Sequence, residues 1–273
     1  MERIKEAIER AKAARQKSQD VPSRQRPMAP LPTGRVNDAS PAQTAFASVT
    51  LDRGHLEANR IVALDGTDPR AGRFDMLRTQ VVQRMVENRW QNLAITSPKP
   101  GCGKTVTSVN LALSIARQPD RRVLLIDLDL RNPHVAEYLG FQPRYRLLDV
   151  FLGEVPLGDA LVAPHVPGEG FLVLGNSQPV GNSAELISSV HVREMVSALR
   201  RRFADYIIIF DMSPMLSTDD MLAFMPLVDC MMLVAAVGQS SVVDVEECER
   251  HIAADNYLGI VLNKAEEALD TYY

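Results

Sequence analysis

Two glycines, a lysine and a threonine stand close together in the stretch SPKPGCGKT, and these residue types suit phosphate binding. Gly101 and Gly103 carry no Cβ, so backbone N–H groups could surround an anion there. Lys104 would reach the β- and γ-phosphates of a nucleotide, and the Thr105 hydroxyl would bind the Mg²⁺ ion that bridges them. We interpret the stretch as a phosphate-binding loop, although Pro98 replaces the first glycine of the general pattern G-x-x-x-x-G-K-[ST].

Carboxylates occur at the ends of two later apolar runs. The run VLLIDLDLR contains Asp127 and Asp129, whose spacing puts both on one face of a strand, and the run YIIIFD ends in Asp211. The carboxyl ends of neighbouring parallel strands meet at one edge of a sheet, so we expect these carboxylates near Lys104 and Thr105. There they would hold Mg²⁺ directly or through water, and one of them could accept a hydroxyl proton.

These residues must be positioned by strands and helices that alternate along the chain. Short Val/Ile/Leu runs predict buried strands, and apolar residues at helical spacing predict the helices between them. The pattern indicates an α/β fold, a P-loop NTPase three-layer α/β/α sandwich with a mostly parallel central sheet. The expected strands are 93–95, 123–130, 171–175, 206–211, 230–237 and 258–263, and the main expected helices are 74–86, 109–115, 184–203 and 242–253.

The sequence divides into three parts. Residues 1–59 predict an N-terminal amphipathic helix and a Pro-rich disordered linker, and residues 60–265 predict the P-loop domain. Residues 266–273 form a short C-terminal tail with two terminal tyrosines. The N-terminal helix could be a solvated, marginal helix, or it could dock on a partner helix or an anionic membrane surface.

Composition narrows the class of protein. The chain has 273 residues, of which 46% are hydrophobic, enough for a sizeable core. No apolar run approaches the roughly 20 residues of a membrane helix, and the charged N-terminus is unlike a secretory signal, so we expect a cytoplasmic protein. Three separated cysteines predict neither a disulfide framework nor a zinc site. After residue 60 the chain has nineteen Lys/Arg against twenty-seven Asp/Glu, and this acidic balance disfavours a broad nucleic-acid surface.

Three motifs together resemble a known family. SPKPGCGKT, LLIDLDLR and IIIFDMSP are similar to the motifs of the bacterial tyrosine kinases of capsule and exopolysaccharide synthesis, which are related to the Min and Par positioning ATPases. The resemblance runs from about Arg60 to the end of the chain. It includes MLRT before the domain, PVGNSAELISS near residue 179, VLN near residue 261, and the positions of Asp220 and Asp229.

The resemblance implies ATP and Mg²⁺ as cofactors and assigns roles to residues. Lys104, Asp127, Asp129 and Asp211 would be catalytic, and Thr105, Asp127 and Asp211 would hold the metal. We expect Asp129 to be the base that takes the tyrosine proton and Asp127 the Mg²⁺ partner, although the motif also allows the reverse. The nucleotide-binding residues would be Pro100, Gly101, Cys102, Gly103, Lys104, Thr105, Val106, Arg131 and Asn263, the last as a contact to the base.

The resemblance also implies partners. A kinase of this kind would act in the cytoplasm, recruited to the inner face of the plasma membrane by a membrane activator of the chain-length type. It would form a homo-oligomer and phosphorylate C-terminal tyrosines of a neighbouring subunit in trans. The chain ends LDTYY, so Tyr272 and Tyr273 are the candidate acceptors.

Some positions depart from the family pattern. Gly72 and Asp75 stand before Arg78 where the ring-forming helix carries E-x-x-R-x-x-R, so we expect the oligomeric contact to differ or be absent. Ser213 replaces the first proline after Asp211, a change expected to matter little. Lys99 stands where the positioning ATPases keep a lysine that reaches across an ATP-bound dimer, or it is an ordinary exposed lysine.

Lys99 therefore keeps a second function open, a dimeric ATPase switch of the positioning type. A third is a nucleotide-bound, non-catalytic regulatory subunit of a polysaccharide export system that docks through its N-terminal helix. The D-x-D-x-R motif and the terminal tyrosines favour the kinase over both alternatives.

Overall fold

The computed structural model describes residues 46–168 and 170–265. The predicted N-terminal helix, most of the predicted linker and the tyrosine tail lie outside these residues. The described strands are β1 Ala47–Thr50, β2 Asn92–Thr96, β3 Arg122–Leu128, β4 Val162–His165, β5 Phe171–Leu174, β6 Tyr206–Met212, β7 Cys230–Ala236 and β8 Tyr257–Asn263.

These strands form one sheet in the order β1-β4-β5-β3-β6-β2-β7-β8. The strands from β5 to β8 in this order are parallel, whereas β4 pairs antiparallel with β5 and parallel with β1. β2 lies inside the sheet between β6 and β7, so the loop that follows β2 emerges beside the end of β6.

The helices are α2 Arg53–Ala58, α3 Ala71–Asn88, α4 Lys104–Ala116, α5 Val135–Leu139, α6 Leu147–Phe151, α7 Leu157–Ala160, α8 Ser183–Ile187, α9 Val190–Arg202, α10 Asp220–Phe224 and α11 Val242–His251, with 3₁₀ turns η1 Met225–Leu227 and η2 Ala254–Asn256. Within the described part of the chain, no helix is both long enough and apolar enough to cross a bilayer.

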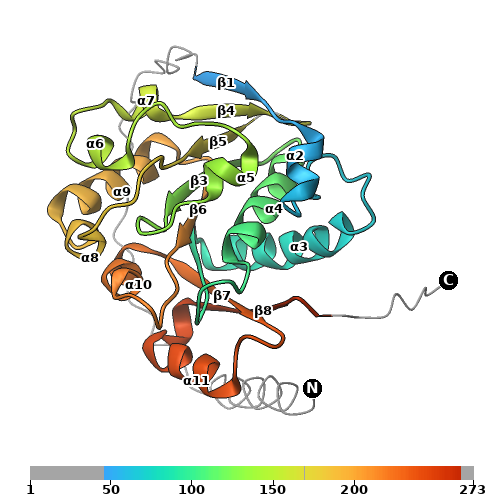
Figure 1. The fold of residues 1–273 in the computed structure, drawn as a ribbon, viewed down its shortest axis with the longest axis vertical. Coiled ribbons are helices and arrows are strands. Elements are labelled where there is room, and N and C mark those ends of the chain that lie inside the picture. The colour runs from blue at the N-terminus through green and yellow to red at the C-terminus, as the bar shows by residue number, and fades with distance from the viewer. Residues whose placement is uncertain (1–45, 169, 266–273) are drawn as a thin grey trace, which may run out of the picture. The chain divides into compact units, whose positions relative to one another are not determined.

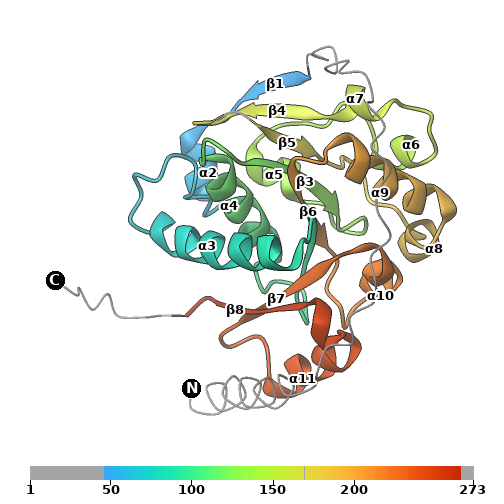
Figure 2. The ribbon, with the colours of Figure 1, turned by 180° about the vertical axis from the view of Figure 1, so that it is seen from behind.

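The helices cover both faces of the sheet. Successive strand residues alternate between two cores: Leu125 and Ile209 belong to the core with α3 and α4, whereas Leu124 and Ile208 belong to the core with α9 and α10. Figure 1 shows α3 and α4 on one side of the sheet and α9 and α10 on the other, and Figure 2 shows the same layers from behind. This arrangement confirms the three-layer α/β/α fold and explains why the central strands are apolar on both faces.

Two predicted boundaries differ from the structure. We expected the folded domain to begin at residue 60, but β1 pairs with β4 and α2 begins after its N-cap Asp52. We also expected one helix over 184–203, but α8 ends at Ile187 and α9 begins after Ser189, whose hydroxyl accepts a hydrogen bond from the Val192 N–H. A serine that caps a new helix start therefore divides the predicted helix.

Candidate active site

The loop between β2 and α4 turns at two glycines. Gly101 and Gly103 have φ angles of 79° and 92°, in the left-handed region that residues with a Cβ rarely adopt. A Cβ on Gly103 would lie 2.1 Å from Nδ2 of Asn263, which donates a hydrogen bond to the Cys102 carbonyl at 2.9 Å. α4 begins at Lys104, directly after the loop, so the positive end of its dipole faces the loop. This backbone suits an anion such as phosphate.

The acidic strand ends lie beside this loop. In the parallel register Asp211 of β6 is opposite Asp127 of β3 on one side and Ile95 of β2 on the other. Asp127 and Asp211 are fully buried, and Asp129, one residue beyond the end of β3, is 3% exposed. The fold therefore brings the three predicted carboxylates to the carboxyl edge next to the phosphate-binding loop.

Lys104 points at these carboxylates. Its Nζ lies 2.6 Å from Oδ2 of Asp129 and 3.8 Å from Oδ2 of Asp211, and the lysine is 8% exposed. Burial disfavours the charged ammonium, but the carboxylates of Asp211 and Asp129 outweigh that cost and raise the pKa of Lys104 above its usual value. A positive charge is therefore held at the site before any nucleotide binds.

Asp211 is oriented by two hydroxyls from the first turns of α4. Thr105 Oγ1 donates to Oδ2 of Asp211 at 2.7 Å, and Ser108 Oγ donates to Oδ1 at 2.9 Å. Ser108 was not among the predicted site residues. It follows Lys104 by one helical turn, so helical spacing from the Gly-Lys-Thr motif is the signal that could have found it.

Asp127 keeps one oxygen without a partner. Its Oδ2 accepts a hydrogen bond from the Val135 N–H at 2.9 Å, whereas its Oδ1 is buried and has no hydrogen-bond partner. An unpaired buried carboxylate oxygen on a residue opposite Asp211, which Thr105 contacts, suits a hydrated divalent cation. Among the described residues, no group of three or more His, Cys, Asp or Glu side chains is placed to bind a metal ion.

Burial raises the pKa of both strand carboxylates. Burial raises the pKa of Asp127 well above its ordinary value, and the neighbouring charge of Asp211 adds to the rise. Burial likewise raises the pKa of Asp211, although Lys104 and the Thr105 hydrogen bond oppose this. The pair is therefore poised to gain a positive ion, which would relieve both effects.

Asp129 is connected to the protein surface through a chain of polar contacts. Ser213 Oγ lies 3.0 Å from Oδ1 of Asp129 and 3.0 Å from Oδ2 of Asp220. Ser183 Oγ donates to Oδ1 of Asp220 at 2.8 Å and accepts from Nε of Arg131 at 2.9 Å. Arg131, a predicted nucleotide contact, is thus engaged with α8 and α10 in this structure rather than with the phosphate-binding loop.

Lys99 is held within its own chain. Its Nζ lies 2.7 Å from Oδ2 of Asp244, which also accepts a hydrogen bond from the Ser241 N–H at the start of α11. The Lys99 hydrogen bond, with that of the Ser241 backbone, lowers the pKa of Asp244 to about 2. The lysine side chain is still half exposed.

The remaining predicted residues have less distinctive surroundings. Pro100 is exposed at the turn, and Val106 is half-buried against the core beneath α4. Asn263 contacts the loop backbone at Cys102, and Cys102 Sγ lies 3.3 Å from Ser240 Oγ. Tyr272 and Tyr273 lie outside the described residues. Ser183 and the role of Ser213 were missed, because no spacing in the sequence indicates that these serines share Asp220.

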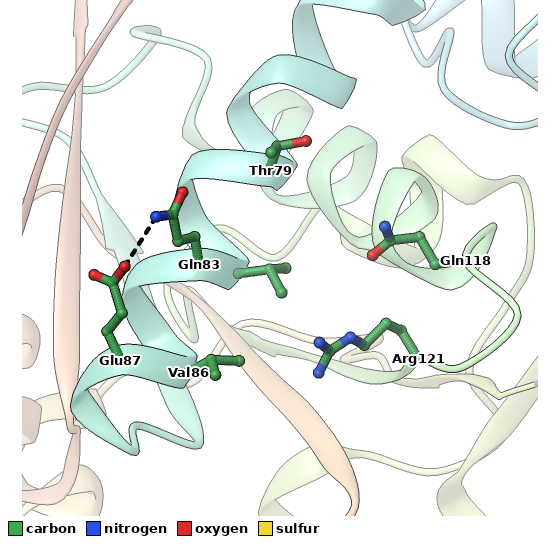
Figure 3. Close-up of a pocket in the computed structure, with 7 residues that line it drawn as sticks. Thr79, Gln83, Val86, Glu87, Gln118 and Arg121 are labelled. Atoms are coloured by element: carbon green, nitrogen blue, oxygen red, sulfur yellow. Dashed lines mark hydrogen bonds between the residues drawn. The ribbon is translucent and has the colours of Figure 1, made fainter.

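A cavity of about 420 Å³ opens between α3 and the segment after α4, away from the predicted site. Figure 3 shows Gln118 and Arg121 across from α3, where the Gln83 amide donates to Glu87 at 2.9 Å. None of its lining residues belongs to the phosphate-binding loop or to the acidic strand ends. They are Thr79, Val82, Gln83, Val86, Glu87, Gln118 and Arg121.

Comparisons with known proteins agree with this geometry. Residues 90–246 match the AAA domain family. The tyrosine-protein kinase CpsD of Streptococcus agalactiae is 32% identical over 202 residues, which cover 73% of this chain and 85% of that protein. The tyrosine-protein kinase YwqD of Bacillus subtilis is 29% identical, covering 78% of this chain and 89% of that protein. The kinase domain of the Escherichia coli tyrosine kinase ETK superposes with a TM-score of 0.64 at 27% identity, covering 78% of this chain and 84% of that one.

Proposed function

This chain belongs to the bacterial tyrosine-protein kinases, and we propose that it transfers the γ-phosphoryl group of ATP to tyrosine hydroxyls. One observation carries the proposal: the phosphate-binding lysine, Lys104, lies 2.6 Å from Asp129 at an edge that also holds Asp127 and Asp211. A cation for phosphate and a carboxylate for a hydroxyl proton are the two groups that the reaction requires.

The side chains divide the work of the reaction. Lys104 turns from Asp129 to the β- and γ-phosphates, which leaves Asp129 free to accept the proton of an incoming tyrosine hydroxyl. The tyrosine oxygen then bonds to the γ-phosphorus while the bond to the β,γ-bridging oxygen breaks, and ADP leaves. Thr105, Asp127 and Asp211 would hold Mg²⁺. When bound, this ion would neutralise part of the negative charge of the phosphates.

The proposed acceptors are Tyr272 and Tyr273 of another copy in a homo-oligomer. By resemblance to its family, the kinase would be cytoplasmic and recruited to the inner face of the plasma membrane by a membrane activator. Phosphorylation of the tail would then regulate capsule or exopolysaccharide polymerisation and export.

Phosphotyrosine mapping of the full chain tests this function. Wild type and Lys104→Met are incubated with ATP and Mg²⁺, with and without the cytoplasmic segment of a membrane activator, and analysed by mass spectrometry. We expect phosphate on Tyr272 or Tyr273 in wild type and none in the variant. A wild-type tail that stays unphosphorylated with the activator present, although ATP binds, contradicts the proposal.

The alternative of a dimeric ATPase switch has less support. It requires Lys99 to be available to a second subunit, and here Lys99 Nζ is paired at 2.7 Å with Asp244 of its own chain. The alternative would be favoured if ATP drove dimerisation and Lys99→Ala abolished it.

A further inference from the structure

Ser213 stands between two buried carboxylates. Its Oγ lies 3.0 Å from an oxygen of Asp129 and 3.0 Å from an oxygen of Asp220. Ser213 and Asp220 are fully buried and Asp129 is 3% exposed, so their hydrogen bonds must come mainly from protein groups and not from bulk water. Ser213 thus links Asp129, beside Lys104, to Asp220, a carboxylate that has no role in the proposed phosphotransfer.

The hydroxyl can serve only one of its two neighbours at a time. A serine hydroxyl carries one proton, and an ionised carboxylate only accepts hydrogen bonds. Asp220 has other support, because Ser183 donates to its Oδ1 at 2.8 Å and Arg131 Nε lies 3.6 Å from its Oδ2. In the resting site Asp129 is neutralised by Lys104 at 2.6 Å.

Nucleotide binding changes this balance. When Lys104 turns to the phosphates, Asp129 loses its nearest cation and keeps the Asn132 N–H at 3.3 Å as its other donor. A buried carboxylate with so few hydrogen-bond donors has a high free energy, and few contacts hold its side chain in one orientation. Rotation of the Ser213 hydroxyl proton from Asp220 to Asp129 would supply a donor without moving any heavy atom.

We propose that Ser213 is a positioning residue for Asp129, whose hydroxyl proton turns from Asp220 to Asp129 when Lys104 leaves for the phosphates. The inference rests on the proposed phosphotransfer. Ser213 keeps the Asp129 carboxylate aimed at the tyrosine hydroxyl, while Ser183 and Arg131 keep Asp220 satisfied. Loss of the hydroxyl removes one hydrogen bond in each state, to Asp220 before ATP binds and to Asp129 afterwards, so ATP binding should change little. Turnover should fall, because only the nucleotide-bound state needs an oriented Asp129.

The experiment compares full-length Ser213→Ala with wild type for tyrosine phosphorylation and for ATP binding. We expect kcat to fall by about 10- to 100-fold, because misorientation of a reacting group costs that much, while the KM and Kd for ATP stay within a factor of about two. Ser213→Thr, which restores a hydroxyl, should recover most of the lost kcat. Ser114→Ala is the matched control, since Ser114 is also fully buried and bonded to an aspartate, Asp75, between α3 and α4.

The variant Asp220→Asn distinguishes orientation of Asp129 by Ser213 from a role of the cluster in stability alone. An asparagine amide can donate to Ser213, which commits the serine proton to Asp129, so this variant should keep at least about tenfold more kcat than Ser213→Ala. A purely structural cluster predicts that both variants lose kcat together with thermal stability.

Three results overturn the inference. The first is a Ser213→Ala kcat close to that of wild type. The second is an Asp220→Asn loss of kcat as large as that of Ser213→Ala. The third is a rise in the Kd for ATP as large as the fall in kcat. Each is measured against an active wild type, so it leaves the kinase function standing. A wild type that binds ATP but transfers no phosphate overturns the proposed function and this inference with it.

Discussion

Lys104 and Asp129 form an ion pair with Nζ 2.6 Å from Oδ2, so the phosphate-binding cation and the candidate base neutralise each other. In the proposed mechanism, ATP displaces Asp129 from Lys104 before the reaction can start. The same event would then fill the proposed phosphate site and free the candidate base, so nucleotide binding would prepare the site for tyrosine.

This coupling predicts opposite effects of Asp129→Asn on binding and on turnover. Removing the carboxylate charge frees Lys104, so Mg-ATP should bind as tightly as in wild type or up to about tenfold tighter, about 1.4 kcal/mol. Phosphotransfer should fall by about 100-fold or more, because no base takes the tyrosine proton. Calorimetric titration and phosphotyrosine quantification measure the two quantities. Lys104→Met, which should lose both, is the control, and weaker ATP binding by Asp129→Asn would contradict the coupling.

The pair of Lys99 and Asp244 predicts a specific acid sensitivity. Lys99 and the Ser241 backbone lower the pKa of Asp244 to about 2, below its ordinary value of 3.8. Folded Asp244 binds its proton less tightly than unfolded Asp244, so the stabilisation is complete above about pH 4 and is lost as the pH falls towards about pH 2. Lys99→Ala should lower the free energy of unfolding at pH 6 by at most about 1 kcal/mol, because the lysine is half exposed.

The difference in stability between Lys99→Ala and wild type should narrow at pH 3, as chemical denaturation at both pH values would show. Asp244→Asn is the matched variant and should show the same narrowing.

The same proteins distinguish the kinase from the dimeric ATPase switch. A kinase should keep its ATP-dependent oligomeric state in Lys99→Ala, and light scattering that shows its loss would favour the dimeric switch.

Wild type should be less stable than the variant Asp127→Asn. Burial and Asp211 raise the pKa of Asp127, so the folded state penalises the ionised form. This penalty grows as the pH rises above about 4 and is complete above the folded pKa. Asp127→Asn should therefore raise the free energy of unfolding at pH 7.5 by about 1 kcal/mol in the absence of Mg²⁺, while phosphotransfer falls.

Denaturant unfolding at pH 7.5 and at pH 5 measures this effect. The gain from Asp127→Asn should shrink at the lower pH, where the raised pKa leaves a larger fraction of wild-type Asp127 protonated. A variant less stable than wild type at both pH values would show that the Val135 hydrogen bond, at 2.9 Å, outweighs the buried charge.

Much of the site follows from the sequence because strand ends and helix starts are strongly marked there. Val/Ile/Leu runs ending in Asp127 and Asp211 predict parallel strands, and the register places these two residues opposite each other. We expected a helix over 109–115 after the phosphate-binding loop, and α4 covers that range but begins earlier, at Lys104. These features depend on local residue types, so a single sequence contains them.

The parts that the sequence did not predict depend on contacts between distant residues. β1 and β4 are four residues long, and β4 contains Pro164, so neither has a clear strand pattern. The contact of Ser213 with Asp129 and Asp220 joins residues 84 and 7 positions apart, and no periodicity reports it. We expected the replacement of proline by Ser213 to matter little, and the structure instead places its hydroxyl against the candidate base.

Asp75 connects α3 to α4 within one chain. Its carboxylate accepts hydrogen bonds from Arg117 at 2.6 and 2.7 Å, from Ser114 at 2.5 Å and from Arg78 at 3.1 Å. Asp75 and Arg78 stand where the ring-forming helix of the family has its charged motif, yet here their partners belong to the same subunit. Any contact between copies must therefore use other residues or break this cluster.

Asp75→Ala should consequently destabilise the fold without changing assembly. It leaves the guanidinium groups of Arg78 and Arg117, 16% and 14% exposed, without their carboxylate, at a cost of about 2–4 kcal/mol in the free energy of unfolding. Glu247→Ala, which removes an exposed partner of Arg250, is the control and should change it by no more than about 0.5 kcal/mol. Denaturant unfolding and light scattering with ATP provide the two measurements. If Asp75→Ala is nearly as stable as wild type but loses an oligomer that wild type forms, Asp75 acts between subunits after all.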